Sequence, residues 1–216
     1  MAKKSKNSTA KASTSQSRRS RNELRQATAR KRRNQNLMLI GGGAILVALI
    51  GLVVFTNIRS QQPVGTEESL PSLGNIHIDL ESRSPITYNS TPPTSGPHYG
   101  GLARWAVHKD PLPYEQVLHN LEDGGVAIYY QCEEDCPELV SQLEEVVSPF
   151  IRADRNVLLV PNVPTWSLNG GAPWHKDMES QIALTAWQRV DKFDEFDAER
   201  VRSFIERYEG IDHHAR

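Results

Sequence analysis

The first 36 residues contain no aromatic side chain and almost no acid. They hold 12 Lys or Arg and one carboxylate, Glu23, so this basic tail carries a net charge of +11. Proteins that bind single-stranded nucleic acid stack bases on aromatic side chains, so we expect no nucleic-acid partner. We expect the tail to be disordered when free and to bind anionic inner-leaflet lipids, where each nearby basic residue contributes about 1 kcal/mol.

Residues 37–55, LMLIGGGAILVALIGLVVF, contain no charged side chain. At about 1.5 Å per residue, a helix of this length spans roughly 28 Å, close to the hydrocarbon thickness of a bilayer. The segment has no polar face, which argues against a helix buried in a soluble core. The following TNIRSQQPVG has no small-x-small cleavage site, which argues against a cleaved signal peptide. We therefore predict one uncleaved transmembrane helix in the lipid bilayer.

Basic residues are distributed unequally on the two sides of this segment. RKRR (30–33) lies on its N-terminal side, whereas Arg59 stands alone on the other side. Loops rich in Lys and Arg stay in the cytoplasm. We therefore predict a single-pass protein of the cell membrane, with a cytoplasmic N-terminus and with residues 60–216 outside.

The part after the apolar segment is expected to be an α+β domain on a tether. Residues 56–76 contain Pro, Gly and Ser without a sustained period, which is typical of a linker. Residues 77–210 are long enough to bury a core, and 211–216 form a C-terminal tail. The chain lacks an internal repeat. The domain's pattern predicts a small mixed β-sheet flanked by helices, with helices at 113–123, 137–149 and 197–210 and strands at 86–89, 126–130, 156–161 and 182–190.

Histidines and carboxylates in this domain form the main candidate metal site. His98 lies on the stiff, proline-rich loop TPPTSGPHYG (91–100), and His119, Glu122 and Asp123 lie at i, i+3 and i+4 on a predicted helix. Imidazoles with carboxylates are ligands that Zn²⁺ or Cu²⁺ accepts. A stiff loop would lower the entropy cost of closing a site between His98 and His119, and either His77 or Asp123 could contribute. The alternative is that His98 binds a backbone carbonyl to hold its loop, while the two carboxylates are solvated.

Cys132 and Cys136 are the only cysteines and form a C-x3-C pattern at a predicted strand-to-helix junction. Exported proteins meet oxidising conditions, so a disulfide is the first expectation. A redox-active or copper-binding thiol pair is the alternative, because the N-terminus of a helix favours a thiolate. Glu133, Glu134 and Asp135 oppose a thiolate, and the spacing differs from the C-x2-C of thioredoxin-type sites.

Aromatic residues make up only 7% of the chain, and some of them stand in loops. Trp166 and Trp174 flank the SLNGGAP loop and could line a binding groove, whereas Trp187 falls in a predicted core strand. The Pro-rich and aromatic loops suggest a third alternative, a module that binds another envelope protein. Three further histidines show no clear geometry in the sequence: His175, His213 and His214.

Three segments resemble one bacterial family: YNSTPPTSGPHY, VLHNLEDGGVAIYY and ALTAWQRVDKFDEFDAERVRSFIERY. They are similar to the domain of unknown function 3105 family, whose members typically have a short basic N-terminus, one membrane span and an outer domain. The resemblance covers about residues 76–210 and implies topology and boundaries, since the family has no established activity. Four residues agree with the family pattern: His77, His98, His119 and Glu122. Asp123 departs from it, because members often read H-x-x-E-H where this chain has an aspartate.

The family pattern also matches the H-x-x-E-H zinc-peptidase signature, in which both histidines bind zinc and the glutamate polarises water. In this chain the second ligand would be Asp123, on a helix that ends at once in Gly124-Gly125. A short match of this kind is usually accidental, so we assign no catalytic residue. The sequence favours an anchored extracytoplasmic protein that binds a transition metal, with a thiol redox protein or metallochaperone and an interaction module as alternatives.

Overall fold

The computed structural model describes residues 30, 38, 41–43, 45–54 and 65–214. The chain separates into two units, 1–59 and 60–216, which we describe separately. In the first unit, the described residues are helical and exposed. Among the described residues, no helix combines the length and the apolarity that crossing a bilayer requires. The predicted span at 37–55 and the basic tail include residues outside the described set, so both stay predictions.

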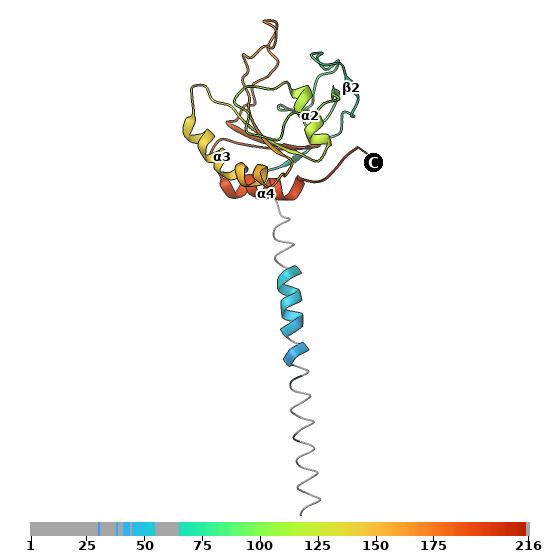
Figure 1. Cartoon of the computed structure of the whole chain (residues 1–216), viewed down its shortest axis with the longest axis vertical. Coiled ribbons are helices and arrows are strands. Elements are labelled where there is room, and N and C mark those ends of the chain that lie inside the picture. The colour runs from blue at the N-terminus through green and yellow to red at the C-terminus, as the bar shows by residue number, and fades with distance from the viewer. Residues whose placement is uncertain (1–29, 31–37, 39–40, 44, 55–64, 215–216) are drawn as a thin grey trace, which may run out of the picture. The chain divides into compact units, whose positions relative to one another are not determined.

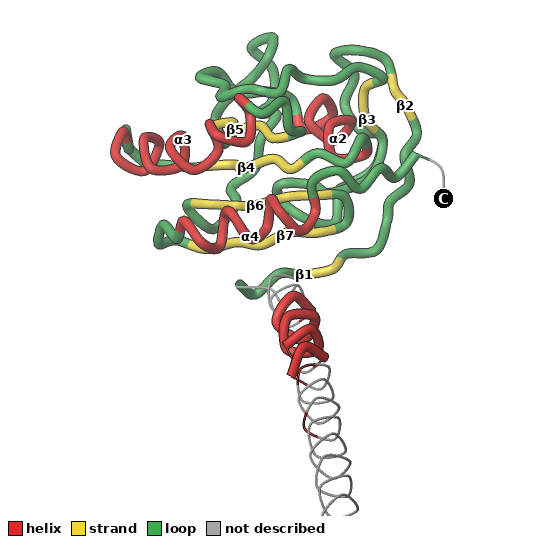
Figure 2. The backbone as a smooth tube through the Cα atoms, turned by 60° about the horizontal axis from the view of Figure 1, so that its bottom comes forward, coloured by secondary structure: helices red, strands yellow, loops and turns green. Residues whose placement is uncertain are grey.

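In the second unit, five strands form one mixed sheet in the order β1-β7-β6-β4-β5 (Figures 1 and 2). These strands are β1 (Glu68–Ser69), β4 (Val126–Tyr130), β5 (Val157–Pro161), β6 (Ile182–Ala186) and β7 (Arg189–Phe193). β4 and β5 are parallel, and the other neighbours are antiparallel. Helix α3 (Pro137–Arg152) provides the crossover that a parallel pair requires. β1 lies in the segment expected to be a linker.

The sheet has a separate core on each face, because alternate residues of a strand point to opposite sides. Val126 and Ile128 of β4 pack in the core beneath α3 and α4 (Ala198–Tyr208). Ala127 and Tyr129 pack in the other core, which α2 (Tyr114–Glu122) covers. The domain therefore has a mixed sheet between helices, and the predicted α+β class is confirmed.

The helices follow their predicted patterns closely. α3 begins at Pro137, as predicted. Asp197 caps α4, since its Oδ1 accepts hydrogen bonds from the backbone N–H groups of Glu199 and Arg200 at 2.9 and 3.1 Å. The apolar residues of α2 recur at i, i+3, i+4 and i+7, and all four are buried: Tyr114, Val117, Leu118 and Leu121.

The single strand predicted at 182–190 is wrong, because the chain reverses within it. β6 and β7 form a hairpin in which Ala186 pairs with Arg189, and Gln188 in the turn has a φ of 61°. Trp187 therefore lies in the turn, although it is buried as expected. The Gln188 N–H donates to the Thr94 carbonyl at 3.0 Å, so the turn is held by the loop that precedes His98.

Two smaller predictions are also wrong. The strand predicted at 86–89 is irregular backbone, and Tyr88 instead donates its hydroxyl to the Pro97 carbonyl at 2.6 Å. Helix α3 does not stop at Pro149 but continues to Arg152. Proline removes one helical hydrogen bond, and the packing of the following residues, Phe150 and Ile151, against the core offsets that loss.

A second, two-stranded sheet lies against α2. It pairs β2 (His77–Ile78) with β3 (His98–Tyr99) in parallel, and His77 is the register partner of His98. The His98 N–H donates to the Ile76 carbonyl at 3.0 Å. β3 packs against α2, so the small sheet carries two predicted site histidines to the helix that holds the others.

Candidate metal centre

The pairing of β2 with β3 brings His77 and His98 side by side. Residues in register on neighbouring strands project from the same face of a sheet, and the two imidazole centroids lie 4.9 Å apart. The side chain of His98 is fully buried, whereas that of His77 is 50% exposed. The pair therefore joins a buried imidazole to one that solvent can reach.

The stiff loop before β3 fixes the orientation of His98. Gly96 adopts a φ of 123°, a region that favours glycine, and its carbonyl lies 2.8 Å from Nδ1 of His98. Tyr88 donates to the carbonyl of Pro97 next in the chain. The backbone bond that the sequence suggested as an alternative role for His98 is therefore present, and it leaves Nε2 facing α2.

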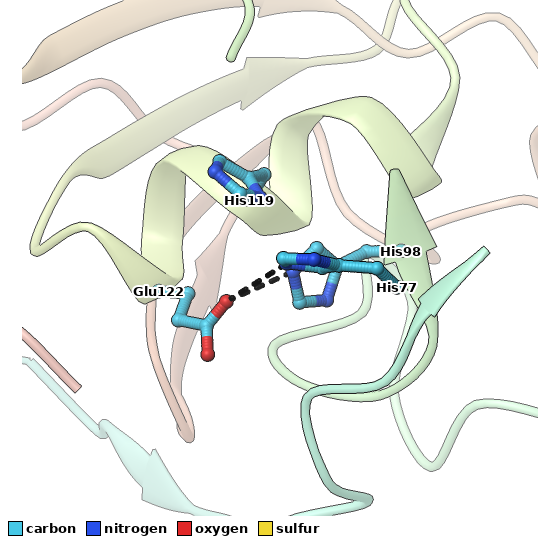
Figure 3. Close-up of side chains that lie close together, drawn as sticks. All are labelled: His77, His98, His119 and Glu122. Carbon is cyan, nitrogen blue, oxygen red and sulfur yellow. Dashed lines mark ion pairs between the residues drawn. The ribbon is translucent and has the colours of Figure 1, made fainter. Parts of the chain in front are cut away.

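Helix α2 supplies the other two members of the cluster, His119 and Glu122 (Figure 3). Their i, i+3 spacing puts both on one side of the helix, and both are buried, at 9% and 1% exposure. The His119 ring centroid lies 5.1 Å from that of His77 and 5.3 Å from that of His98. One possible ligand atom from each of the four residues lies within 4.8 Å of the others.

A carboxylate oxygen and an imidazole nitrogen face each other inside this cluster. Glu122 Oε2 lies 2.9 Å from His98 Nε2 and 3.8 Å from His77 Nε2. Because Nδ1 of His98 must donate to the Gly96 carbonyl, Nε2 of the neutral ring carries a lone pair. Burial lowers the pKa of His98, while the Gly96 carbonyl and the Glu122 charge oppose that shift. In the neutral ring, two lone pairs therefore repel each other at 2.9 Å; either a proton on Nε2, which makes the contact an ion pair, or a metal ion between the two atoms removes that repulsion.

Among the described residues, three buried polar atoms of this cluster have no hydrogen-bond partner: His98 Nε2, His119 Nδ1 and Glu122 Oε2. The first and the third of them form an ion pair only when His98 is protonated. Buried side-chain atoms without a partner are rare in folded proteins, and here they come from three residues whose possible ligand atoms lie together. The donor set is imidazole nitrogen and carboxylate oxygen, which fits a borderline transition metal.

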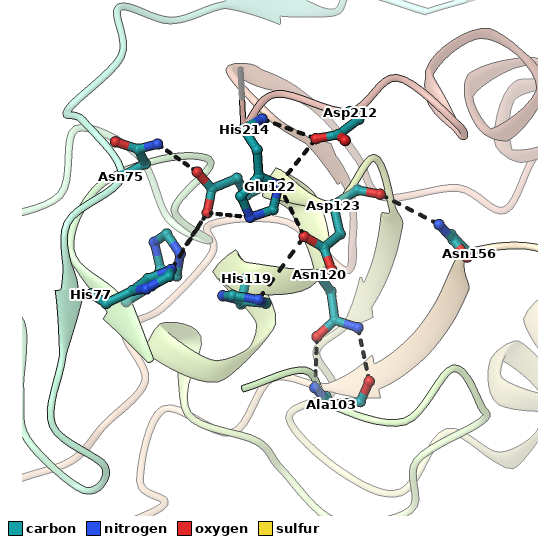
Figure 4. Close-up of polar contacts among 11 residues, drawn as sticks. Asn75, His77, Ala103, His119, Asn120, Glu122, Asp123, Asn156, Asp212 and His214 are labelled. Atoms are coloured by element: carbon teal, nitrogen blue, oxygen red, sulfur yellow. Dashed lines mark hydrogen bonds and ion pairs between the residues drawn. The ribbon is translucent and has the colours of Figure 1, made fainter. Parts of the chain in front are cut away.

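A neighbouring amide holds the carboxylate of Glu122 in place. Asn75 Nδ2 donates to Glu122 Oε1 at 2.6 Å (Figure 4). That bond occupies the oxygen opposite the one that faces His98. Groups that orient metal ligands in this way raise metal affinity. Asn75 comes just before β2, so the same segment positions both this amide and His77.

The C-terminal segment folds back on the end of α2. The His213 N–H donates to the Glu122 carbonyl at 2.9 Å, and the Gly210 N–H donates to the Gly124 carbonyl at 2.8 Å. Gly124 has a φ of 79°, and a Cβ added to Gly124 would lie only 2.9 Å from the backbone of Ile211. The turn after α2 therefore requires glycine to receive this tail.

This tail carries His214 to the edge of the cluster (Figure 4). Its Nε2 lies 3.5 Å from Glu122 Oε2, and its Nδ1 lies 3.2 Å from Asp123 Oδ1. The pKa of His214 is raised, mainly because its ring forms a hydrogen bond with Asp212. No local sequence pattern indicates this placement, because the contact joins residues as far apart in the chain as Glu122 and His214.

Asp123 lies outside the group of four. It joins His119 and His214 in a second group whose possible ligand atoms also lie within 4.8 Å of one another. Its Oδ1 is 3.9 Å from His119 Nε2, and its side chain is 27% exposed. Of the two residues expected to contribute beside His98, His119 and Glu122, the structure brings His77 into the cluster and leaves Asp123 at its edge.

His108 and His175 lie outside the cluster, and their imidazoles bond to backbone groups. His108 Nε2 lies 2.8 Å from the Arg104 carbonyl, near the surface. His175 is buried, accepts from the Val163 N–H at 3.0 Å and donates to the Leu112 carbonyl at 2.7 Å. Burial lowers the pKa of His175 to about 4.

Each of the two loop tryptophans contacts one neighbouring side chain. The Trp166 ring lies 5.1 Å from the His175 ring, and the guanidinium of Arg83 stacks over Trp174 at 4.5 Å. Cys132 and Cys136 form a disulfide with a Cα–Cα distance of 6.1 Å, as first expected. It lies between β4 and α3.

A comparison with known protein families matches residues 79–215 to the family described as "Protein of unknown function (DUF3105)". The match includes His98, His119 and Glu122 and begins two residues after His77. Neither curated proteins nor solved structures show a match to this chain.

Proposed function

We propose that this chain, which belongs to the DUF3105 family, binds one transition-metal ion through His77, His98, His119 and Glu122. The observation that carries the proposal is the buried approach of His98 Nε2 to Glu122 Oε2 at 2.9 Å, where the neutral ring has no N–H to donate because Nδ1 bonds the Gly96 carbonyl. A bound cation would accept both lone pairs and turn this repulsion into attraction.

The distances between the ligand atoms are close to those around a bound zinc ion. Two ligands bound tetrahedrally at about 2.0–2.1 Å from zinc lie about 3.3 Å apart. The 2.9 Å and 3.8 Å that separate Glu122 Oε2 from His98 and His77 bracket that value. Small side-chain rotations would therefore bring these three groups onto one ion.

The ligand set favours Zn²⁺ or Cu²⁺ over other common ions. Imidazole suits both metals, whereas Mg²⁺ and Ca²⁺ prefer oxygen ligands alone. The four proposed ligands include no sulfur, so selectivity for a soft ion such as Cu⁺ has no basis in this cluster. The half-exposed His77 leaves a path by which an ion could enter from solvent.

Metal content tests the proposal directly. The full-length chain is purified, loaded with Zn²⁺ or Cu²⁺, passed over a desalting column and measured by elemental analysis beside His98→Ala and a control, His108→Ala. We expect about one ion per chain in the wild type and the control, and much less in His98→Ala. Equal metal content in all three proteins would contradict the proposal.

We also propose that residues 37–55 anchor the domain outside the cell membrane, with the basic tail on anionic cytoplasmic lipids. The support is the charge-free segment and the unequal distribution of Lys and Arg around it. Protease added to intact cells with a permeable outer layer should then digest residues 65–214. A domain that is digested only after the membrane is lysed would contradict this placement.

A further inference from the structure

The Cys132–Cys136 disulfide lies at the start of the crossover helix of a βαβ unit. The chain runs through β4, α3, β5, β6, β7 and α4. Four of the five strands lie in the order β7-β6-β4-β5, with β6 antiparallel to both of its neighbours. Cys132 and Cys136 stand in the connection from β4 to α3 of the βαβ unit. C-x-x-C redox motifs are recognised beside such a βαβ unit, and this chain has a C-x3-C pair.

Both cysteines line an open groove of about 620 Å³ at the carboxyl ends of β4 and β5. The groove also includes Pro161 and Val163 from the end of β5 and Val140 from α3. Ligands of open α/β sheets bind outside the carboxyl ends of the strands. The cysteines are only partly buried, so the disulfide lies where another molecule can reach it.

The groove is acidic. Four carboxylates line it, Glu133, Glu134, Asp135 and Glu144, and no Lys, Arg or His of the described part of the chain does. Clefts lined by charge of one sign concentrate ligands of the opposite sign. A groove that combines apolar side chains with carboxylates therefore fits a polypeptide segment that carries basic residues beside an apolar anchor.

We propose that the Cys132–Cys136 disulfide exchanges with a pair of thiols on a polypeptide whose cysteines are flanked by basic residues. The proposal uses none of the residues of the metal cluster. In the first step, a thiolate of the partner attacks Sγ of Cys132, the Cys132–Cys136 bond breaks, and Cys136 leaves as a thiolate that takes up a proton.

In the second step, the partner's other thiol loses its proton and attacks its own sulfur in the mixed disulfide, which releases Cys132. The partner loses two electrons and two protons, and the cysteine pair gains them. The acidic residues between the cysteines disfavour a thiolate at both sulfurs. Cys136 is the better leaving group of the two because it is the N-cap residue of α3, and the N-terminus of a helix stabilises a thiolate. Cys132 is therefore the sulfur that forms the mixed disulfide.

The test uses the oxidised full-length chain and two synthetic dithiol peptides that differ only in carrying Lys or Glu around their cysteines. Maleimide labelling measures the reduction of the chain, and chromatography measures the peptide disulfide formed. We expect equal amounts of both products, and at least about fivefold faster reaction with the Lys peptide at low salt. The preference should shrink in roughly 1 M salt.

Variants identify the groups responsible. Glu133→Gln/Glu134→Gln/Asp135→Asn keeps both cysteines and should remove most of the preference for the Lys peptide. Cys136→Ser, mixed with the oxidised Lys peptide, should accumulate a disulfide-linked adduct through Cys132, whereas Cys132→Ser should accumulate much less. Circular dichroism checks that each variant is folded.

A chain that stays oxidised in excess peptide would overturn the proposal. So would equal rates for the two peptides with the wild type, because the acidic groove would then have no role in recognition. Both of these results come from the unaltered protein, so they do not depend on whether a cysteine variant folds.

Discussion

Zn²⁺ should stabilise the folded domain, and His98→Ala should remove most of that stabilisation. With free Zn²⁺ at about 1,000 times the dissociation constant, a single site adds about 4 kcal/mol to the free energy of unfolding. Structural zinc sites bind with about 10–16 kcal/mol, so one ligand of four accounts for roughly 3 kcal/mol. Its loss weakens affinity about 100-fold, and the same Zn²⁺ concentration then adds only about 1.4 kcal/mol.

Thermal unfolding followed by circular dichroism measures this difference. For a domain of this size, about 2–4 °C of melting temperature corresponds to 1 kcal/mol, so the Zn²⁺-induced increase should fall from about 10 °C to about 4 °C. Each protein is compared with itself in a chelator, because His98→Ala also loses the bond to Gly96 and leaves a cavity. His108→Ala is the matched control, since the His108 imidazole bonds the Arg104 carbonyl near the surface and lies outside the cluster. An equal increase in the wild type and His98→Ala would refute the reasoning.

Three further predictions concern groups around and beyond the cluster. Asn75→Ala should lower Zn²⁺ affinity by roughly 10–100-fold without changing the stoichiometry, because it frees the Glu122 carboxylate; unchanged affinity in a chelator competition would contradict this role. His214→Ala should lower the affinity by only about threefold, because its contacts with the cluster are partly exposed; a loss as large as that of His98→Ala would make it a principal ligand. Burial lowers the pKa of His175 to about 4 in the folded protein. Between about pH 6.5 and 4 the unfolded state therefore binds more protons than the folded state. The free energy of unfolding should fall by up to about 3 kcal/mol as the pH drops through that range. Urea unfolding in chelator should show a weaker pH dependence for His175→Gln, and parallel curves would contradict the assignment.

Part of the cluster could be predicted because its geometry is local. His119 and Glu122 share a face of α2 through their helical spacing, and the prolines and glycines around His98 indicated a loop of fixed shape. The structure adds what local patterns do not contain. The β2–β3 pairing that aligns His77 with His98 involves strands of two residues each, too short for a periodic signal.

The contacts that complete the site are distant in sequence. Asn75 reaches Glu122 across 47 residues, and His214 approaches from the C-terminal tail. Neither residue type shows its role in the sequence, since amides and terminal histidines are common on surfaces. Such contacts depend on how the chain packs rather than on local propensity.

The elements themselves were predictable where an apolar period was long. Helices α2 and α4 were predicted because their apolar periods span two or more helical turns. The β6–β7 hairpin was missed because its turn, Trp187-Gln188, contains neither Gly, Pro, Asn nor Asp, which are the residues that mark turns. Its conformation is instead held by tertiary contacts, including the bond from Gln188 to Thr94.

The most direct measurement is anomalous diffraction from a crystal of the Zn²⁺-loaded protein, recorded at the zinc absorption edge. We predict one strong peak among His77, His98, His119 and Glu122, with nitrogen and oxygen ligands at about 2.0–2.2 Å. A zinc-loaded crystal with no peak at these four side chains, or with its peak elsewhere, would contradict the proposed metal site.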